Sequence, residues 1–303
     1  MTYSARDIIR ALGGDWCGQY GLAPDIGHSP QDRGLKIWDA PEIPGGVAVH
    51  SFHGQDFREV RDALAMQGYL PRLRDCKPPD PAEIERRRAE AEQRTREIEA
   101  RSREYALSMW RRSAPAAGTI AERYLRSRAI EIGPFPSLRF SPAMKHKKTG
   151  RQLAGMIAGV QGPDGQLTGV HRTYLRDDGE GKADVKPDKA MLGPCTGGAV
   201  RFAKPQERLA VGEGIETCLS FSQNTGLPVW AALSTAGLRN LILPEAARAV
   251  VIAADRDATG AGERAANEAG ERWHGEGRTV EVVLPPDGFK DFNDAARARE
   301  LAA

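Results

Sequence analysis

The sequence predicts an α/β protein whose last hundred residues form a mostly parallel sheet with flanking helices. Three observations support this fold class. Apolar runs typical of strands alternate with helical runs over residues 201–303, a hairpin-rich basic segment precedes them, and a small mixed unit opens the chain. With 303 residues, of which 40% are hydrophobic, the chain is long enough for two or three compact units.

The C-terminal alternation is the clearest pattern in the chain. Parallel sheets bind ligands at the carboxyl ends of their strands, so residues that directly follow a strand are the first candidates for a site. In chain order the runs are Leu209–Gly212, Ile215–Gln223, Val229–Leu233, Leu238–Leu243, Val250–Ala254, Gly262–His274 and Val280–Leu284.

Residues 105–200 are expected to form an α+β subdomain. Helical spacing over 105–128 precedes a hairpin whose strands, Leu153–Val160 and Leu167–Leu175, are joined by a turn at Pro163–Gly165. Residues 139–204 hold 12 Lys and Arg against 6 Asp and Glu, whereas residues 201–303 hold 12 against 15. A basic part beside an acidic part suits an enzyme that processes a polyanion, because cationic side chains attract phosphates and carboxylates hold metal ions.

Residues 1–76 are expected to form a small unit with helices near Ala5–Leu12 and Phe57–Gln67 and a strand at Val47–Phe52. A proline-rich run, Lys77–Pro81, ends it. Residues 77–104 are expected to be a charged helical linker, because 81–104 contains seven Arg and seven Glu and almost no large apolar side chain.

Several classes of protein are excluded. No stretch approaches the roughly 18 apolar residues of a membrane helix, and the N-terminus lacks the pattern of a secretory signal, so we expect a cytoplasmic protein without a membrane partner. The four cysteines are scattered without a CxxC pair, which argues against disulfides and an ordinary zinc ribbon. They are Cys17, Cys76, Cys195 and Cys218.

Three carboxylates follow the first and third predicted strands of the C-terminal sheet. Glu213 lies between Gly212 and Gly214, and Asp255 and Asp257 follow Val250–Ala254. Carboxylates gathered at one sheet edge would form an oxygen-rich site for Mg²⁺ or Mn²⁺. The alternative is that they merely cap helices, with Asp257 capping a helix near Thr259.

Two motifs resemble the Toprim domain shared by bacterial primases, topoisomerases and some nucleases. They are Leu209–Thr217, with the sequence LAVGEGIET, and Val251–Gly260, with the sequence VIAADRDATG. A later run, Gly288–Asp294, resembles the third acidic element of primase-type Toprim domains. The resemblance implies a Rossmann-like domain over 201–303 in which Glu213, Asp255 and Asp257 are catalytic and, with Asp291, hold two Mg²⁺ or Mn²⁺ ions.

Upstream, Trp110, Gly118, Tyr124–Arg128 and Gly197–Arg201 resemble the segment that precedes the Toprim domain in phage- and plasmid-type primases. That resemblance implies a mobile-element DNA primase that makes short primers on single-stranded DNA from nucleoside triphosphates, with a separate replicative helicase as partner because no GxxxxGK[ST] motif is present. It also implies phosphate contacts, and the alternative for each residue is a solvated hairpin edge. The residues concerned are Arg172, Lys186, Lys189 and Arg201.

Residues 1–76 also resemble a degenerate primase zinc-binding domain, around Asp32-Arg33 and Val49–Asp56. The family's cysteine ligands are missing here. Cys17, His28, His50 and His53 could rebuild a site, but their spacing fits no standard zinc pattern, so we expect no zinc.

Two other functions compete with the primase, and a third, that of a topoisomerase, is excluded. A Toprim nuclease would use the same carboxylates to activate water, but such nucleases usually carry an attached ATPase. A single-strand DNA-binding replication subunit without catalysis would gain nothing from acidic groups that face phosphates. A topoisomerase would need a tyrosine-bearing domain for which the chain has no room.

Overall fold

The computed structural model describes residues 3–17, 20–76, 80–131, 133 and 135–302. The expected proline break at Lys77–Pro79 lies outside these residues. The chain divides into two compact units, residues 1–97 and 98–303.

The N-terminal unit contains an antiparallel four-stranded sheet with the order β1-β2-β3-β4. Helices α1 and α2 pack on this sheet. Their buried side chains Ile8, Ile9, Val60 and Leu64 share one core with the strand residues Leu35, Ile37, Val47 and Val49. The helices and the strand expected in residues 1–76 are confirmed to within one residue at each end. The elements are α1 (Ala5–Ala11), β1 (Asp15–Trp16), β2 (Gly21–Ala23), β3 (Leu35–Asp39), β4 (Val47–Ser51), α2 (Phe57–Met66) and the 3₁₀ turn η1 (Leu73–Asp75).

One helix, α3 (Pro81–Arg112), contains the charged segment and runs past its expected end at residue 104. Exposed ion pairs such as Arg86–Glu90 line its first turns. Near its C-terminus the pattern changes, because Ala106 and Met109 are buried in the core of the C-terminal unit. Helical spacing in 105–128 therefore belongs to the end of α3 and to a separate helix, α4 (Ile120–Ser127).

The C-terminal unit is built on a ten-stranded mixed sheet, counted over the described residues. Eight of the strands follow the order β14-β13-β11-β12-β10-β7-β6-β5. The other two lie off this path, where β8 pairs with β7 and β9 pairs with β8. Strands β14, β13, β11 and β12 are mutually parallel, whereas β10 and the strands beyond it pair antiparallel. The strands are β5 (Ala114–Pro115), β6 (Leu138–Lys145), β7 (Gln152–Gln161), β8 (Leu167–Tyr174), β9 (Lys189–Leu192), β10 (Ala199–Arg201), β11 (Arg208–Gly212), β12 (Val229–Ala231), β13 (Ala249–Ala253) and β14 (Thr279–Val283).

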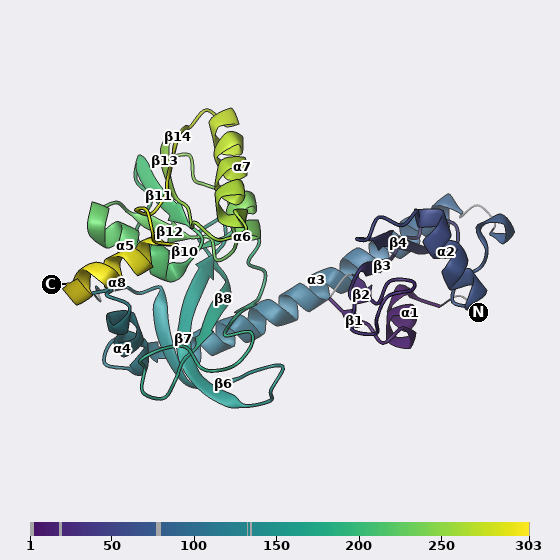
Figure 1. Cartoon of the computed structure of the whole chain (residues 1–303), viewed down its shortest axis with the longest axis horizontal. Coiled ribbons are helices and arrows are strands. Elements are labelled where there is room, and N and C mark those ends of the chain that lie inside the picture. The colour runs from purple at the N-terminus through teal and green to yellow at the C-terminus, as the bar shows by residue number, and fades with distance from the viewer. Residues whose placement is uncertain (1–2, 18–19, 77–79, 132, 134, 303) are drawn as a thin grey trace. The chain divides into compact units, whose positions relative to one another are not determined.

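Helices cover both faces of the parallel strands (Figure 1). On one face α5 (Ile215–Thr225) and α8 (Phe292–Ala302) pack together, and alternate strand residues such as Ala210 and Val251 point into their core. On the other face α6 (Thr235–Asn240) and α7 (Ala261–Gly275) enclose Trp273, Val211 and Ile252. The predicted α/β fold class is confirmed, because apolar runs without polar alternation form strands buried on both faces.

Strand β10 joins the two halves of this sheet. Val200 pairs with Ala231 of β12 on one side and with Val160 of β7 on the other. The boundary that the sequence suggested between residues 200 and 201 falls inside this strand, and the sheet continues across it. The basic segment and the parallel strands therefore share one hydrogen-bonded framework.

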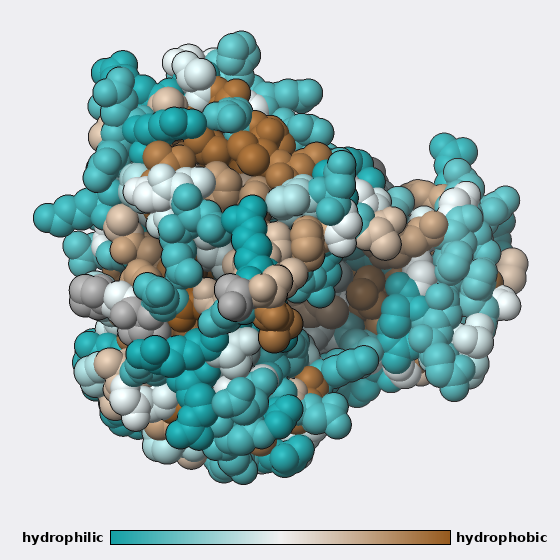
Figure 2. Space-filling model, turned by 60° about the vertical axis from the view of Figure 1, so that its left-hand side comes forward, coloured by the Kyte–Doolittle hydropathy of each residue, from teal (hydrophilic) through white to brown (hydrophobic). Residues whose placement is uncertain are grey.

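The described helices include none that is both long enough and apolar enough to span a bilayer. Most of the surface in Figure 2 is hydrophilic, with an apolar area near the top of the view, at the height of β13 and β14 in Figure 1. Strand β14 is an edge strand of the sheet, and its Val282 side chain is exposed.

Candidate metal and phosphate site

Glu213 and Asp255 follow two adjacent parallel strands. In the register of β11 and β13, Gly212 lies opposite Ala253, so the residues after both strands emerge at the same sheet edge. A side chain at Gly212 would force its neighbours to shift, because a Cβ atom there would lie 2.9 Å from Sγ of Cys218 and 3.1 Å from the Ala253 carbonyl oxygen. The close approach of the two strand ends therefore depends on glycine.

Asp255 is partly buried in negatively charged surroundings. Burial, together with the negative charges of Asp291 and Glu213, raises the pKa of Asp255 to about 7 from an ordinary value of 3.8. The Thr217 hydroxyl group on α5 donates a 3.2 Å hydrogen bond to Oδ1 of Asp255, and Lys189 also opposes the shift. A carboxylate in this position is costly to ionise unless a cation lies nearby.

Glu213 is also partly buried among charged side chains. Burial raises its pKa, and the charge of Asp257 adds to the rise, whereas Lys189 lowers it. The Glu213 carbonyl oxygen accepts a 2.8 Å hydrogen bond from the amide of Leu233, whose φ of 73° is unusual for a branched side chain. This strained backbone just after β12 is the kind of conformation that concentrates at functional sites.

Asp257 has the capping role that the sequence offered as an alternative. Its Oδ1 accepts hydrogen bonds from the Thr259 amide (2.8 Å) and the Ala261 amide (3.2 Å), and its Oδ2 accepts one from the Gly262 amide (2.7 Å) at the start of α7. These bonds, with the one from the Thr259 hydroxyl group, lower the pKa of Asp257. Among the described residues, the Gly262 amide is the one donor to Oδ2, so a lone pair remains for a further ligand.

Asp291 approaches from the loop before α8. The Arg256 amide donates a 2.7 Å hydrogen bond to the Lys290 carbonyl oxygen, which ties this loop to the one that carries Asp255 and Asp257. Oδ1 of Asp291 accepts a 2.7 Å hydrogen bond from the Asp294 amide and so caps α8. Asp291 is also the charged group that most raises the pKa of Asp255.

The four carboxylates are thus electrostatic neighbours, but their oxygens do not form a tight cluster. In the described part of the chain, the group of potential ligands whose atoms all lie within 4.8 Å of one another is a different one, His28, Asp32 and His53. Hydrogen bonds from backbone amides hold Asp257 and Asp291 in their capping positions at the starts of α7 and α8. The donor set, all carboxylate oxygens, suits a hard divalent ion.

Lys189 supplies positive charge beside the acidic residues. It lies at the start of β9, and its charge lowers the pKa values of Glu213 and Asp255. Its side chain is exposed, so the ammonium group is accessible to a ligand. Of the four basic residues selected from the sequence, Lys189 is the one that perturbs both Glu213 and Asp255.

The other three basic residues differ in their surroundings. Arg172 on β8 donates to the Met191 carbonyl oxygen at 3.5 Å, and Lys186 is exposed in the loop before β9. Arg201 lies over the Trp230 ring, 4.1 Å from its centroid, and donates to the Gly162 carbonyl oxygen. The guanidinium group of Arg201 is therefore already engaged in packing within the sheet.

A buried network that sequence reasoning did not select adjoins the site. The carboxylate of Glu216 is ion-paired with Lys182 at 3.7 Å and accepts a 2.5 Å hydrogen bond from the Tyr124 hydroxyl group. Burial alone would raise the pKa of Glu216, but Lys182, Lys189 and Tyr124 together lower it to about 2. The sequence feature that could have identified Glu216 is its position, three residues after Glu213 in the first turn of α5.

Comparison with known proteins identifies the domain that carries these residues. Residues 208–300 match the family model described as Toprim domain, and residues 100–202 match the model described as domain of unknown function DUF7146. The C-terminal part of the chain is therefore a Toprim domain, as the two acidic motifs predicted. No curated protein matches the chain.

Solved primase structures are similar at low identity. The Aquifex aeolicus primase, with its zinc-binding and RNA polymerase domains, is 14% identical with a TM-score of 0.42, covering 99% of this chain and 82% of that one. The DnaG catalytic core is 19% identical with a TM-score of 0.42, over 59% and 69%. The RNA polymerase domain of Mycobacterium tuberculosis primase DnaG is 15% identical with a TM-score of 0.31, over 63% and 68%.

Proposed function

We propose that the chain is a primase-like nucleotidyltransferase, which makes short primers on single-stranded DNA from nucleoside triphosphates and depends on a divalent metal. The proposal rests on one observation. Glu213 and Asp255 follow adjacent parallel strands of a Toprim domain, and Lys189 lies close enough to lower the pKa of both. An acidic site with an accessible cation beside it suits a metal-bound nucleotide phosphate.

Each residue would have a distinct part in this reaction. Glu213, Asp255, Asp257 and Asp291 would hold Mg²⁺ or Mn²⁺, which supplies neutralising charge for nucleotidyl transfer when bound. Alternatively, Glu213 would accept the proton of the attacking 3′-hydroxyl instead of holding metal, a role that its raised pKa suits. Thr217 would keep the Asp255 carboxylate in its orientation, and Lys189 would contact the triphosphate.

The template is proposed to run along the basic segment. Arg172 and Lys186 would contact its phosphates, since Arg172 lies on β8, which pairs with the strand that begins at Lys189, and Lys186 lies in the loop just before that strand. Arg201 is proposed to contribute mainly through packing, because its guanidinium group is stacked on Trp230. A helicase supplied by another chain remains part of the proposal.

The test supplies single-stranded DNA, labelled nucleoside triphosphates and Mg²⁺ or Mn²⁺, and measures short oligonucleotide products. Asp255→Asn should abolish them. The matched control is Glu245→Gln, which removes an exposed carboxylate that precedes β13, at the opposite end of the strand from Asp255. Equal product from wild type and Asp255→Asn, or none from wild type, contradicts the proposal.

The same assay separates the alternatives. A Toprim nuclease would shorten the template without incorporating label, and Asp255→Asn would stop the shortening. A single-strand DNA-binding subunit would retain DNA equally well in both proteins and yield neither product.

A further inference from the structure

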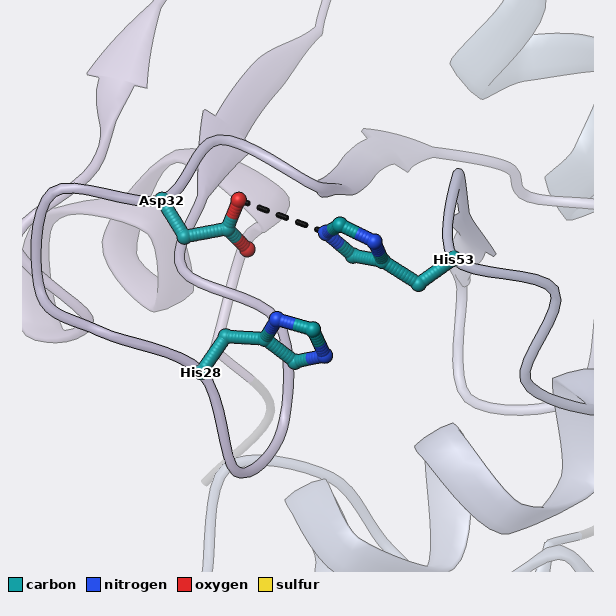
Figure 3. A group of neighbouring side chains, drawn as sticks. All are labelled: His28, Asp32 and His53. Atoms are coloured by element: carbon teal, nitrogen blue, oxygen red, sulfur yellow. Dashed lines mark hydrogen bonds and ion pairs between the residues drawn. The ribbon is translucent and has the colours of Figure 1, made fainter.

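A second group of potential metal ligands lies in the N-terminal unit, outside the Toprim domain. His28 and Asp32 come from the loop between β2 and β3, and His53 follows β4 (Figure 3). Their ligand atoms all lie within 4.8 Å of one another. Ligands around a tetrahedral zinc ion lie about 3–4 Å apart, as its bond lengths of roughly 2.0–2.2 Å require.

We propose that His28, Asp32 and His53 bind one divalent transition-metal ion of the zinc class. Two imidazoles and a carboxylate match the donor preferences of Zn²⁺ and Co²⁺ better than those of Mg²⁺, which prefers oxygen ligands. The site is independent of the proposed primase reaction. It departs from the expectation of a metal-free unit, which was based on the spacing of cysteines and histidines along the sequence.

The side chains already face one another. Nε2 of His53 lies 3.3 Å from Oδ1 of Asp32, and the His28 and His53 rings stack with centroids 4.0 Å apart and planes 15° from parallel. A neutral imidazole offers the lone pair of one ring nitrogen to a metal ion. His28 and His53 are exposed, so an ion can reach them from solvent.

Backbone contacts hold the ligands in place. The Asp25 amide donates a 3.0 Å hydrogen bond to Oδ2 of Asp32, which leaves Oδ1 directed at His53. The buried Asp25 carboxylate accepts a hydrogen bond from the Ser51 hydroxyl group, and the Ser51 oxygen accepts a 3.1 Å bond from the His53 amide. Such outer contacts orient metal ligands and raise affinity.

Gly34 makes room for the cluster. A Cβ atom at this position would lie 2.3 Å from the His53 ring and 2.8 Å from Oδ2 of Asp32. Any side chain here would displace both groups. The absence of a side chain at Gly34 thus lets the imidazole of His53 and the carboxylate of Asp32 lie close together.

Cys17 and His50, the other two candidates from the sequence, are not part of the group. Sγ of Cys17 lies 3.8 Å from the Asp15 carbonyl oxygen, and the His50 ring packs edge-on against Phe52. The third potential ligand in the group is Asp32. His50 is exposed on β4, three residues before His53, and so provides a matched control.

The test uses the tag-free full chain, stripped with a chelator and titrated with Zn²⁺ against a chromophoric competitor. To separate the Toprim carboxylates, every variant is made in the Asp255→Asn background. We expect one tight equivalent in that background, lost or weakened about 100-fold in His28→Ala, His53→Ala and Gly34→Ala and retained in His50→Ala. Co²⁺ titration should give a visible absorption band that follows the same pattern.

Two results would overturn the proposal. One is a tight equivalent that survives His28→Ala and His53→Ala, and the other is a stripped Asp255→Asn chain that takes up no Zn²⁺ at all. Far-UV circular dichroism of each variant separates loss of the site from loss of the fold. Because His28 and His53 are exposed, their replacement by alanine should leave the spectrum unchanged.

Discussion

The hydroxyl group of Tyr124 on α4 donates a 2.5 Å hydrogen bond to the buried carboxylate of Glu216 on α5. The two residues are 92 positions apart in the chain. Tyr124 belongs to the segment that matches DUF7146, and Glu216 belongs to the Toprim domain. This bond therefore joins the two family segments directly beside the proposed site.

Replacing Tyr124 with Phe should destabilise the C-terminal unit by about 1.5–3 kcal/mol, the usual effect of removing a hydrogen bond to a charged group. Urea unfolding at pH 7 measures this change. Tyr105→Phe is the control, because Tyr105 is 49% exposed on α3, and it should change stability by less than about 0.5 kcal/mol. Equal stability of both variants would show that the bond contributes nothing.

Asp255→Asn should make the metal-free protein more stable at alkaline pH. The folded pKa of about 7 exceeds the ordinary 3.8, so the folded state holds a proton between these values and loses stability as pH rises through 7. Relative to wild type, the variant should gain about 1–3 kcal/mol at pH 8 in the presence of a chelator, allowing for screening at a partly exposed site. It should gain little below pH 4.

Urea unfolding at several pH values measures this effect. Asp177→Asn should behave like wild type, because Asp177 is exposed in the loop after β8. A pH-independent difference between wild type and Asp255→Asn would contradict the prediction.

Gly262→Ala should damage the site through the backbone. A Cβ atom there would lie 2.5 Å from the Asp255 carbonyl oxygen and 3.2 Å from Oδ2 of Asp257, and neither the strand end nor the capped turn can yield easily. We expect a loss of about 1–3 kcal/mol in stability and weaker Mn²⁺ uptake. Gly275→Ala, at the other end of α7, meets no atom within 4 Å and should be neutral or slightly stabilising.

Lys189→Gln should weaken nucleotide binding about tenfold, since it removes the exposed cation beside Glu213 and Asp255. It should also move the acidic limb of the activity profile to higher pH, because Lys189 lowers the pKa of both carboxylates. Fluorescent nucleotide titration and pH-dependent primer synthesis measure the two effects. Lys147→Gln, exposed in the turn after β6, should change neither.

The sequence was sufficient for the parallel strands and for the Toprim domain. Unbroken apolar runs such as Val250–Ala254 are distinctive, and glycine and acidic residues mark where strands end. Strand β10, in contrast, escaped prediction. Strand β10 has three residues and reads as a strand only because β7 and β12 pair with it on both sides.

The site was predictable where its residues follow strands and hidden where it depends on long-range contacts. Asp257 was recognised both as a candidate ligand and as a candidate cap, and the structure shows the cap. Tyr124 contacts Glu216, and the His28 ring stacks on the His53 ring. Both contacts join segments far apart in sequence, and hydrophobic periodicity does not predict such contacts. Spacing rules for zinc motifs also overlook a carboxylate such as Asp32, the third ligand of the proposed site.

The most direct test of the account is calorimetric titration of the full chain with Mn²⁺, in the presence of a non-hydrolysable nucleoside triphosphate, for wild type and Asp255→Asn. The account predicts ion uptake by wild type that Asp255→Asn largely removes, while any binding at His28, Asp32 and His53 is common to both proteins and cancels. Identical titration curves for the two proteins would contradict the claim that the Toprim carboxylates hold the metal.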